Sequence, residues 1–243
     1  MAVTGPNFSN AHGTLNVSQS FAANVGTFDN TGGKLITGNL SIATSGDLIN
    51  TDGTLSSATD AKLTVGGKAE NTRGTITAAG ALTANVAGST TNSAGTLASN
   101  QGLTFNTNLL ENTKGSIQSA QASVQLVVTN QLVNGSGGSI NAATDLSVQA
   151  GSLSNSGSVR GANDAGVTVG GALTNDGSIT AGRNTTITTG SLQSSSTGVL
   201  GAGHPERWEA WQCRRSARHR FRRAGRQWGE PCGRERDAAR CER

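Results

Sequence analysis

An asparagine recurs every 20 to 22 residues along most of this 243-residue chain. The nine positions are Asn10, Asn30, Asn50, Asn71, Asn92, Asn112, Asn134, Asn155 and Asn175. The neighbouring residues recur as well, for example in Asn50-Thr-Asp-Gly-Thr-Leu55 and Asn92-Ser-Ala-Gly-Thr-Leu97. A period of this length is typical of a tandem repeat whose units stack on one another, so the fold must give all nine asparagines equivalent positions.

The repeat becomes irregular toward residue 200. Two late copies, 155–159 and 175–179, lack one residue between the asparagine and the next apolar residue. In a tenth, degenerate copy, Ser195 stands where the asparagine is expected, followed by Gly198 and Leu200. We therefore expect about ten units within residues 1–203.

Short stretches in which apolar and polar residues alternate lie between the asparagines. They are Leu40-Ser-Ile42, Leu63-Thr-Val65, Leu103-Thr-Phe105, Val124-Gln-Leu126, Leu146-Ser-Val148 and Val167-Thr-Val169. Another apolar residue often lies two positions before the asparagine, as at Phe28 and Leu132. The period of two predicts strands with one buried face, and the Gly, Asn, Asp and Ser residues between them predict turns.

Strands this short cannot bury their apolar faces alone, so the units must stack as coils of a parallel β-solenoid. The rest of each unit is long enough for the connection that parallel strands require, and no helix is needed. Ten coils would make a rod about 45 Å long, at one strand spacing per coil. An α-solenoid is disfavoured, because Thr, Ser, Gly and Asn are poor residues for helix interiors.

Two structural roles suit the recurring asparagine. It could turn the chain at a corner, because Asn and Gly enter the left-handed backbone region at low cost. Stacked asparagines could also form a ladder of amide hydrogen bonds. Ligand binding is the alternative, but a residue present in every coil is better explained by a requirement of every coil.

The pattern Leu-x-Asn-x-x-Gly-x-Leu followed by Leu-x-Val, over residues 8–203, resembles the haemagglutinin repeats of a family of Gram-negative exoproteins. This family comprises filamentous haemagglutinins, haemolysins and contact-dependent inhibition proteins. The resemblance implies a right-handed parallel β-helix, exported by a two-partner-secretion transporter in the outer membrane and displayed as a long fibre. No signal peptide, secretion domain or toxin module of the family is recognisable, so the chain resembles an internal segment of the rod.

The composition of residues 1–203 argues against catalysis, because this part has no Cys or Tyr and a single histidine, His12. That histidine occupies a position filled elsewhere by Asp52, Arg73 or Lys114, which predicts a solvated turn. The aspartates lie at different distances in sequence from the nearest recurring asparagine, as Asp29, Asp47, Asp52 and Asp176 show. These carboxylates should therefore be spread around the rod. We expect no catalytic, cofactor-binding or metal-binding residues.

Residues 204–243 have a different composition. They hold 12 Arg against 6 Asp and Glu, a net charge of +6, whereas residues 1–203 hold 7 Lys and Arg against 9 Asp and Glu, a net charge of −2. All three Cys and all three Trp lie in this segment, which has no Leu, Ile, Val, Thr or Asn. We expect it to be a disordered tail.

Three interpretations of this tail are open. A metal site could be formed by Cys213, Cys232, Cys241 and His219. Structural zinc sites, however, typically have Cys pairs about two to four residues apart. Nucleic acid could bind to the arginines and to Trp208, Trp211 and Trp228.

The third interpretation, which we favour, is that the tail is the same repeat read in a shifted frame. When the codons of residues 208–214 are read one base later, they encode six successive residues: Gly; Lys or Arg; one free residue; Gly; Asn or Ser; and Ala or Val. Those are the turn residues of the repeat.

We predict a non-enzymatic rod segment of a secreted or surface-displayed bacterial adhesin. The resemblance implies two partners, the outer-membrane transporter and a receptor or glycan on a host or neighbouring cell, with neither nucleic acid nor membrane insertion. No signal peptide or transmembrane segment is present. We therefore expect an extracellular location only as part of the full-length exoprotein.

Two alternative functions are kept. The first is the stalk of a contact-dependent growth-inhibition toxin. The second is a polysaccharide-processing β-helix enzyme, which would need a cleft lined by aligned acidic and basic residues.

Overall fold

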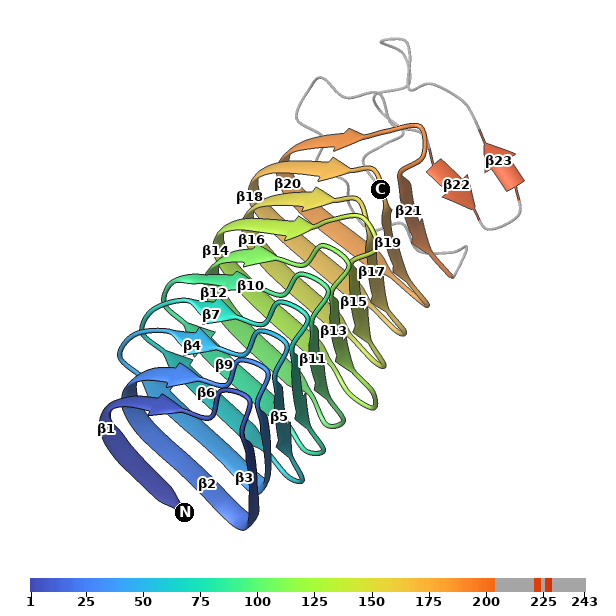
Figure 1. Ribbon diagram of the computed structural model, residues 1–243. Coiled ribbons are helices and arrows are strands. Elements are labelled where there is room, and N and C mark those ends of the chain that lie inside the picture. The colour runs from blue at the N-terminus through green and yellow to red at the C-terminus, as the bar shows by residue number, and fades with distance from the viewer. Residues whose placement is uncertain (204–220, 224–225, 229–243) are drawn as a thin grey trace.

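The computed structural model describes residues 1–203, 221–223 and 226–228, which contain strands and no helix. Residues 1–203 form a parallel β-solenoid of about ten coils (Figure 1). Every strand of a coil pairs in parallel with the equivalent strand of the next coil, as β1 does with β2. The predicted fold is confirmed.

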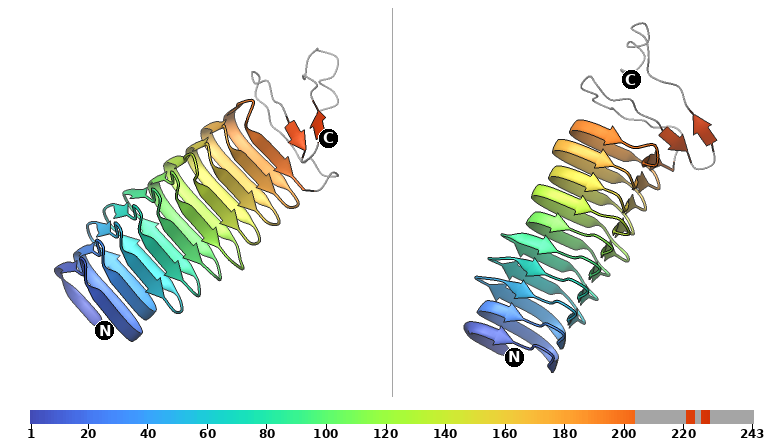
Figure 2. Two further views of the ribbon diagram at one scale, coloured as in Figure 1. Left: turned by 45° about the vertical axis from the view of Figure 1, so that its right-hand side comes forward. Right: turned by 45° about the horizontal axis from the view of Figure 1, so that its top comes forward.

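Each coil has three faces, which give the rod a triangular cross-section (Figures 1 and 2). Face 1 begins with the first half of β1 (Ala2–Ser9), the middle of β2 (Thr14–Asp29) and the second half of β3 (Lys34–Thr44), followed by β6 (Ala61–Val65) and β9 (Leu82–Val86). It continues with the first halves of β12 (Leu103–Glu111), β14 (Val124–Asn134), β16 (Leu146–Asn155), β18 (Ala165–Asn175) and β20 (Thr185–Ser194). Face 2 holds the second halves of these five strands, the ends of β1 and β2, and the short strands β4 (Leu48–Ile49), β7 (Ala69–Glu70) and β10 (Ser89–Thr91).

Face 3 is built mainly from four-residue strands. They are β5 (Thr54–Ser57), β8 (Thr75–Ala78), β11 (Thr96–Ser99), β13 (Ser116–Ser119), β15 (Ser139–Ala142), β17 (Ser158–Gly161), β19 (Ser178–Ala181) and β21 (Val199–Ala202). The beginnings of β2 and β3 complete this face, since they pair with each other and with β5.

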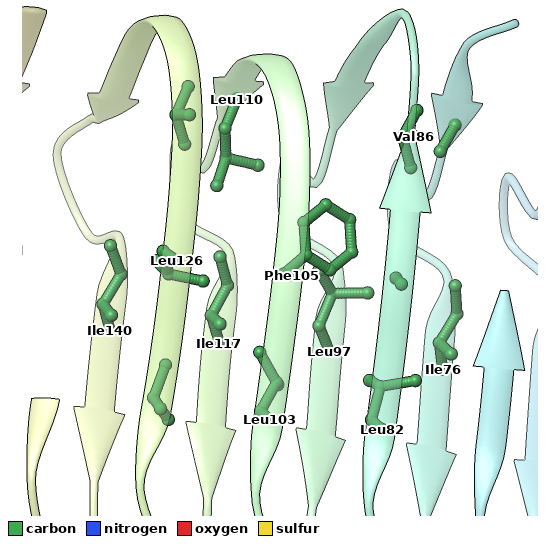
Figure 3. Close-up of a cluster of buried hydrophobic side chains, with 14 of the residues drawn as sticks. Ile76, Leu82, Val86, Leu97, Leu103, Phe105, Leu110, Ile117, Leu126 and Ile140 are labelled. Carbon is green, nitrogen blue, oxygen red and sulfur yellow. The ribbon is translucent and has the colours of Figure 1, made fainter. Parts of the chain in front are cut away.

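The core is a set of columns in which equivalent aliphatic side chains stack from coil to coil. On face 3 the column is Leu35, Leu55, Ile76, Leu97, Ile117, Ile140, Val159, Ile179 and Leu200, all at most 3% exposed. Figure 3 shows part of this column beside Leu82, Leu103 and Leu126 of face 1. The predicted alternation is confirmed, because one residue in two points into this narrow core.

The corner between faces 2 and 3 explains the recurring motif. Two residues after the asparagine, the backbone has a positive φ even where the residue is not glycine, as at Arg73 (54°) and Ala94 (53°). At the next residue the motif requires glycine, because a Cβ on Gly95 would lie 2.0 Å from the backbone oxygen of Asn71. The asparagine is therefore followed first by a left-handed turn and then by a close approach of two coils.

Two expectations about the asparagines are corrected here. No asparagine has a positive φ within the described residues, so the prediction that Asn itself makes the left-handed turn is wrong. The asparagine is still in extended backbone that directs its side chain inward, and the outward residue two positions later makes the turn. In the tenth coil the register pairs Asn175 with Ser194, not with Ser195, because the corner there contains one additional residue.

Within the predicted tail, the structure describes only β22 (Phe221–Arg223) and β23 (Arg226–Trp228), which pair antiparallel. Residues 204–220, 224–225 and 229–243 lie outside the described part of the chain. The prediction of a disordered tail and the domain boundary at residue 203 therefore stay predictions.

Candidate functional site

The recurring asparagines form a continuous ladder inside the rod. The Nδ2 of each asparagine donates to Oδ1 of the asparagine in the next coil, and the eight distances from Asn10 to Asn175 are 2.7–2.8 Å. All but Asn10 are buried, with at most 2% exposed. The predicted amide ladder is confirmed.

Each amide group also holds the backbone of the corner. Asn50 Nδ2 donates to the carbonyl oxygen of Gly53 at 3.2 Å and to that of Thr75 in the next coil at 3.2 Å. Gly53 O also accepts from the backbone N–H of Thr75 at 2.8 Å, so the amide gives this corner carbonyl a second hydrogen bond. Because the amides are buried and bonded within the protein, they offer nothing to a ligand, and the ligand-binding alternative is not supported.

His12 lies in the corner turn, as predicted. It is exposed, its φ is 54°, and its backbone N–H donates to Thr31 O at 2.8 Å. The equivalent positions in the next coils are Gly32 and Asp52, which share the positive φ. The position is therefore selected for a turn on the surface, and no nucleophile or acid lies in contact with the imidazole in the hydrogen-bond network of the described residues.

One of these turn positions carries a close ion pair. Arg73 donates from Nε to Asp52 Oδ1 and from Nη2 to Asp52 Oδ2, both at 2.6 Å. The hydrogen bonds from Arg73 lower the pKa of Asp52, and in turn those to Asp52 raise the pKa of Arg73. Both side chains are largely exposed, so this pair stabilises the fold only slightly.

A second charged group lies at the corner between faces 3 and 1 and was not foreseen. Asp145 and Asp164 occupy equivalent positions in adjacent coils, and Arg183 Nη2 lies 3.8 Å from Asp145 and 3.0 Å from Asp164. The signal was present in the sequence, because each aspartate directly precedes an aligned face 1 strand. The three side chains are 43–58% exposed and carry a net charge of −1, so they lie open to solvent and not in the cleft that a polysaccharide-processing enzyme would need.

The described residues hold neither a metal-binding cluster nor a membrane-spanning helix. No group of three or more His, Cys, Asp or Glu residues lies close enough there to hold a metal ion. None of the elements described is a helix that could cross a bilayer. The tail candidates Cys213, His219, Cys232 and Cys241 lie outside the described residues, as do Trp208 and Trp211.

The repeats of this chain are similar in sequence to a known protein family. The sequence-family model of the haemagglutinin repeat matches residues 122–158 and 142–201. These matches support a filamentous haemagglutinin-like family for this chain. No curated protein and no solved structure matches it.

The haemagglutinin repeats extend structurally beyond the matched residues. The ladder, the corner and the core columns run without interruption from the matched coils back to Asn10. The matched part includes the two shortened corners, Asn155–Gly157 and Asn175–Gly177, in which the described backbone has no positive φ. The haemagglutinin repeat therefore tolerates two corner geometries, provided that the asparagine keeps its place in the ladder.

Proposed function

We propose that this chain is a non-enzymatic rod segment of a secreted or surface-displayed bacterial adhesin. In this role it extends adhesive or effector regions away from the cell toward host or neighbouring cells. The observation that carries the proposal is the uninterrupted asparagine ladder, in which eight hydrogen bonds join the asparagines of nine successive coils in one interior column.

Haemagglutinin repeats are associated with two-partner secretion and adhesion. We therefore propose an outer-membrane transporter as the partner in export, an extracellular location, and a receptor or glycan as the target of the complete fibre. A parallel solenoid suits such a role, because its length grows by about 4.8 Å per coil without any change in the core.

Removing whole coils tests the rod role. Deletion of residues 134–174 joins Val133 to Asn175, keeps the ladder in register and removes two coils. We expect the fibre to fold, to reach the cell surface and to be shorter by about 10 Å in electron micrographs, with attachment to target cells retained. Deletion of residues 134–164 is the matched control, because it breaks the register and should prevent folding.

If the in-register deletion is displayed at the normal level but abolishes attachment, this segment itself carries the receptor site and the rod role is wrong. A gene pair downstream for a toxin and its immunity protein would instead favour the toxin-stalk alternative.

A further inference from the structure

Asn134 is the only asparagine of the ladder that is followed directly by glycine. The residue after each of the others is Ala, Thr, Ser or Asp. Asparagine followed by glycine is the pair most prone to deamidation, because a residue without a Cβ lets its backbone nitrogen approach the side-chain carbonyl carbon. The backbone nitrogen of Gly135 would attack Cγ of Asn134 and ammonia would leave. Water would then open the resulting succinimide to aspartate or isoaspartate.

The fold itself requires the glycine at this position. The corner 134–139 is one residue longer than the aligned corner 112–116. A Cβ on Gly135 would clash with the side chain of Thr113 in the preceding coil. The longer corner therefore places a chemically labile pair at a rung of the ladder.

The folded rod protects the side chain of Asn134. This residue is fully buried, at 0% exposed. Its Oδ1 accepts from Asn112 Nδ2 at 2.8 Å. Its Nδ2 donates to Asn155 Oδ1 at 2.8 Å and to the carbonyl oxygen of Ser158 at 3.1 Å. The carboxamide is therefore fixed on both sides along the ladder and screened from the water that completes the reaction.

The products of deamidation do not fit this ladder. An aspartate formed at position 134 lacks the Nδ2 donor, and its carboxylate would face the oxygens of Asn155 and Ser158 that the amide now binds. Burying an unpaired charge beside unpaired acceptors is strongly unfavourable. Isoaspartate adds a methylene to the backbone and displaces the whole corner.

We propose that Asn134 is a deamidation site that is open only while the chain is unfolded, and that folding of the rod closes it. A chain that stays unfolded loses the ability to complete the ladder, whereas a chain that folds promptly keeps its amide. The site thereby limits the time available between synthesis and folding. This modification goes beyond the rod role, which would hold without it.

The full chain can be incubated in guanidinium chloride and, in parallel, in native buffer at the same pH and temperature. Peptide mapping by mass spectrometry then follows each asparagine over time. In denaturant we expect Asn134 to deamidate at least about tenfold faster than Asn112 or Asn155. In native buffer we expect its deamidation to be at least about 100-fold slower than in denaturant, because it requires opening of the rod.

Two comparisons separate the chemistry from the fold. Gly135→Ala should slow deamidation of Asn134 in denaturant to the rate at Asn112, and this test does not require the variant to fold. Asn134→Asp imitates the product and should refold at least about tenfold less efficiently than the parent chain. Asn141→Asp on face 3 adds the same charge outside the ladder and should refold like the parent.

The proposal is overturned if Asn134 deamidates as fast in native buffer as in denaturant, or if in denaturant it reacts no faster than Asn112. It is also overturned if Asn134→Asp refolds as efficiently as Asn141→Asp.

Discussion

Asn112 Nδ2 donates to Asn134 Oδ1 at 2.8 Å, although these residues are separated by 22 positions in the chain. The same bond between Asn30 and Asn50, which are 20 positions apart, measures 2.7 Å. Both additional residues lie in 120–123, because Ser116 and Val124 are eight positions apart whereas their equivalents Lys34 and Leu40 are six positions apart. This insertion lies at the corner between faces 3 and 1, away from the ladder, and the asparagine keeps its place.

Removing one asparagine from the middle of the ladder should destabilise the rod. Asn92 accepts from Asn71 and donates to Asn112 and to the carbonyl oxygens of Gly95 and Ser116. Asn92→Ala leaves buried groups unpaired, and we expect a loss of about 3 kcal/mol in the free energy of unfolding.

Urea unfolding measures that loss, and amide hydrogen exchange shows whether it is local to the coils beside Asn92, since solenoids can unfold in parts. Asn100→Ala is the control, because Asn100 is exposed, and it should change stability by less than about 0.5 kcal/mol. Equal effects of the two substitutions would contradict a stabilising ladder.

Two buried serines in one column should respond differently to replacement by alanine. Ser57 Oγ donates to the carbonyl oxygen of Asp60 at 2.7 Å, whereas Ser99 Oγ has no partner among the described residues. Ala78 occupies the equivalent position between them, so alanine fits this column. We expect Ser57→Ala to cost about 1 kcal/mol and Ser99→Ala to be neutral or stabilising. Denaturant midpoints of the two variants check the order, and a larger loss for Ser99→Ala would refute it.

Replacing Ala94 with glycine should stabilise the rod. Its φ of 53° is costly for a residue with a Cβ, by about 1–2 kcal/mol, and its side chain is exposed and contributes little packing. After the entropy cost of glycine is subtracted, we expect Ala94→Gly to raise the melting temperature through a gain of about 0.5–1 kcal/mol. Ala98→Gly, in the adjacent strand β11, should lower it. A lower melting temperature for both variants would show that the left-handed backbone is not strained.

The pKa of Asp52 should depend on Arg73. Hydrogen bonds from Arg73 lower this pKa below its ordinary value of 3.8 in the folded chain. The pair therefore stabilises the fold above that value, and its contribution is lost as the pH falls through the folded pKa. Carboxyl ¹³C NMR titration should show the lowered pKa in the parent chain and a return to the ordinary value in Arg73→Gln. An unchanged titration in that variant would mean that the pair does not persist in solution.

The amino-acid sequence predicts the repeat, the parallel solenoid, the inward columns and the amide ladder. These follow from periodicity alone, because an identical unit can bury its core only by stacking on its neighbours. The residue that makes the left-handed turn was predicted wrongly. The turn lies two positions after the asparagine, where the residue varies among His12, Asp52 and Ala94 and so gives no signal in the sequence. The alignment of Asp145 with Asp164 was not predicted, because the corner from Asn134 to Ser139 is longer than the equivalent corner from Asn155 to Ser158.

The amino-acid sequence by itself determined that the chain is a repeat, how long its unit is and which side chains face the core. The tertiary structure decided which polar residues come together on the surface. The Arg183 ion pairs arise in this way, because Asp145, Asp164 and Arg183 lie at different distances in sequence from their recurring asparagines and are aligned only when the coils stack. The physical reason is that one interior column of bonds fixes the register at a single corner, so every insertion moves outward and changes the surface while the core stays the same.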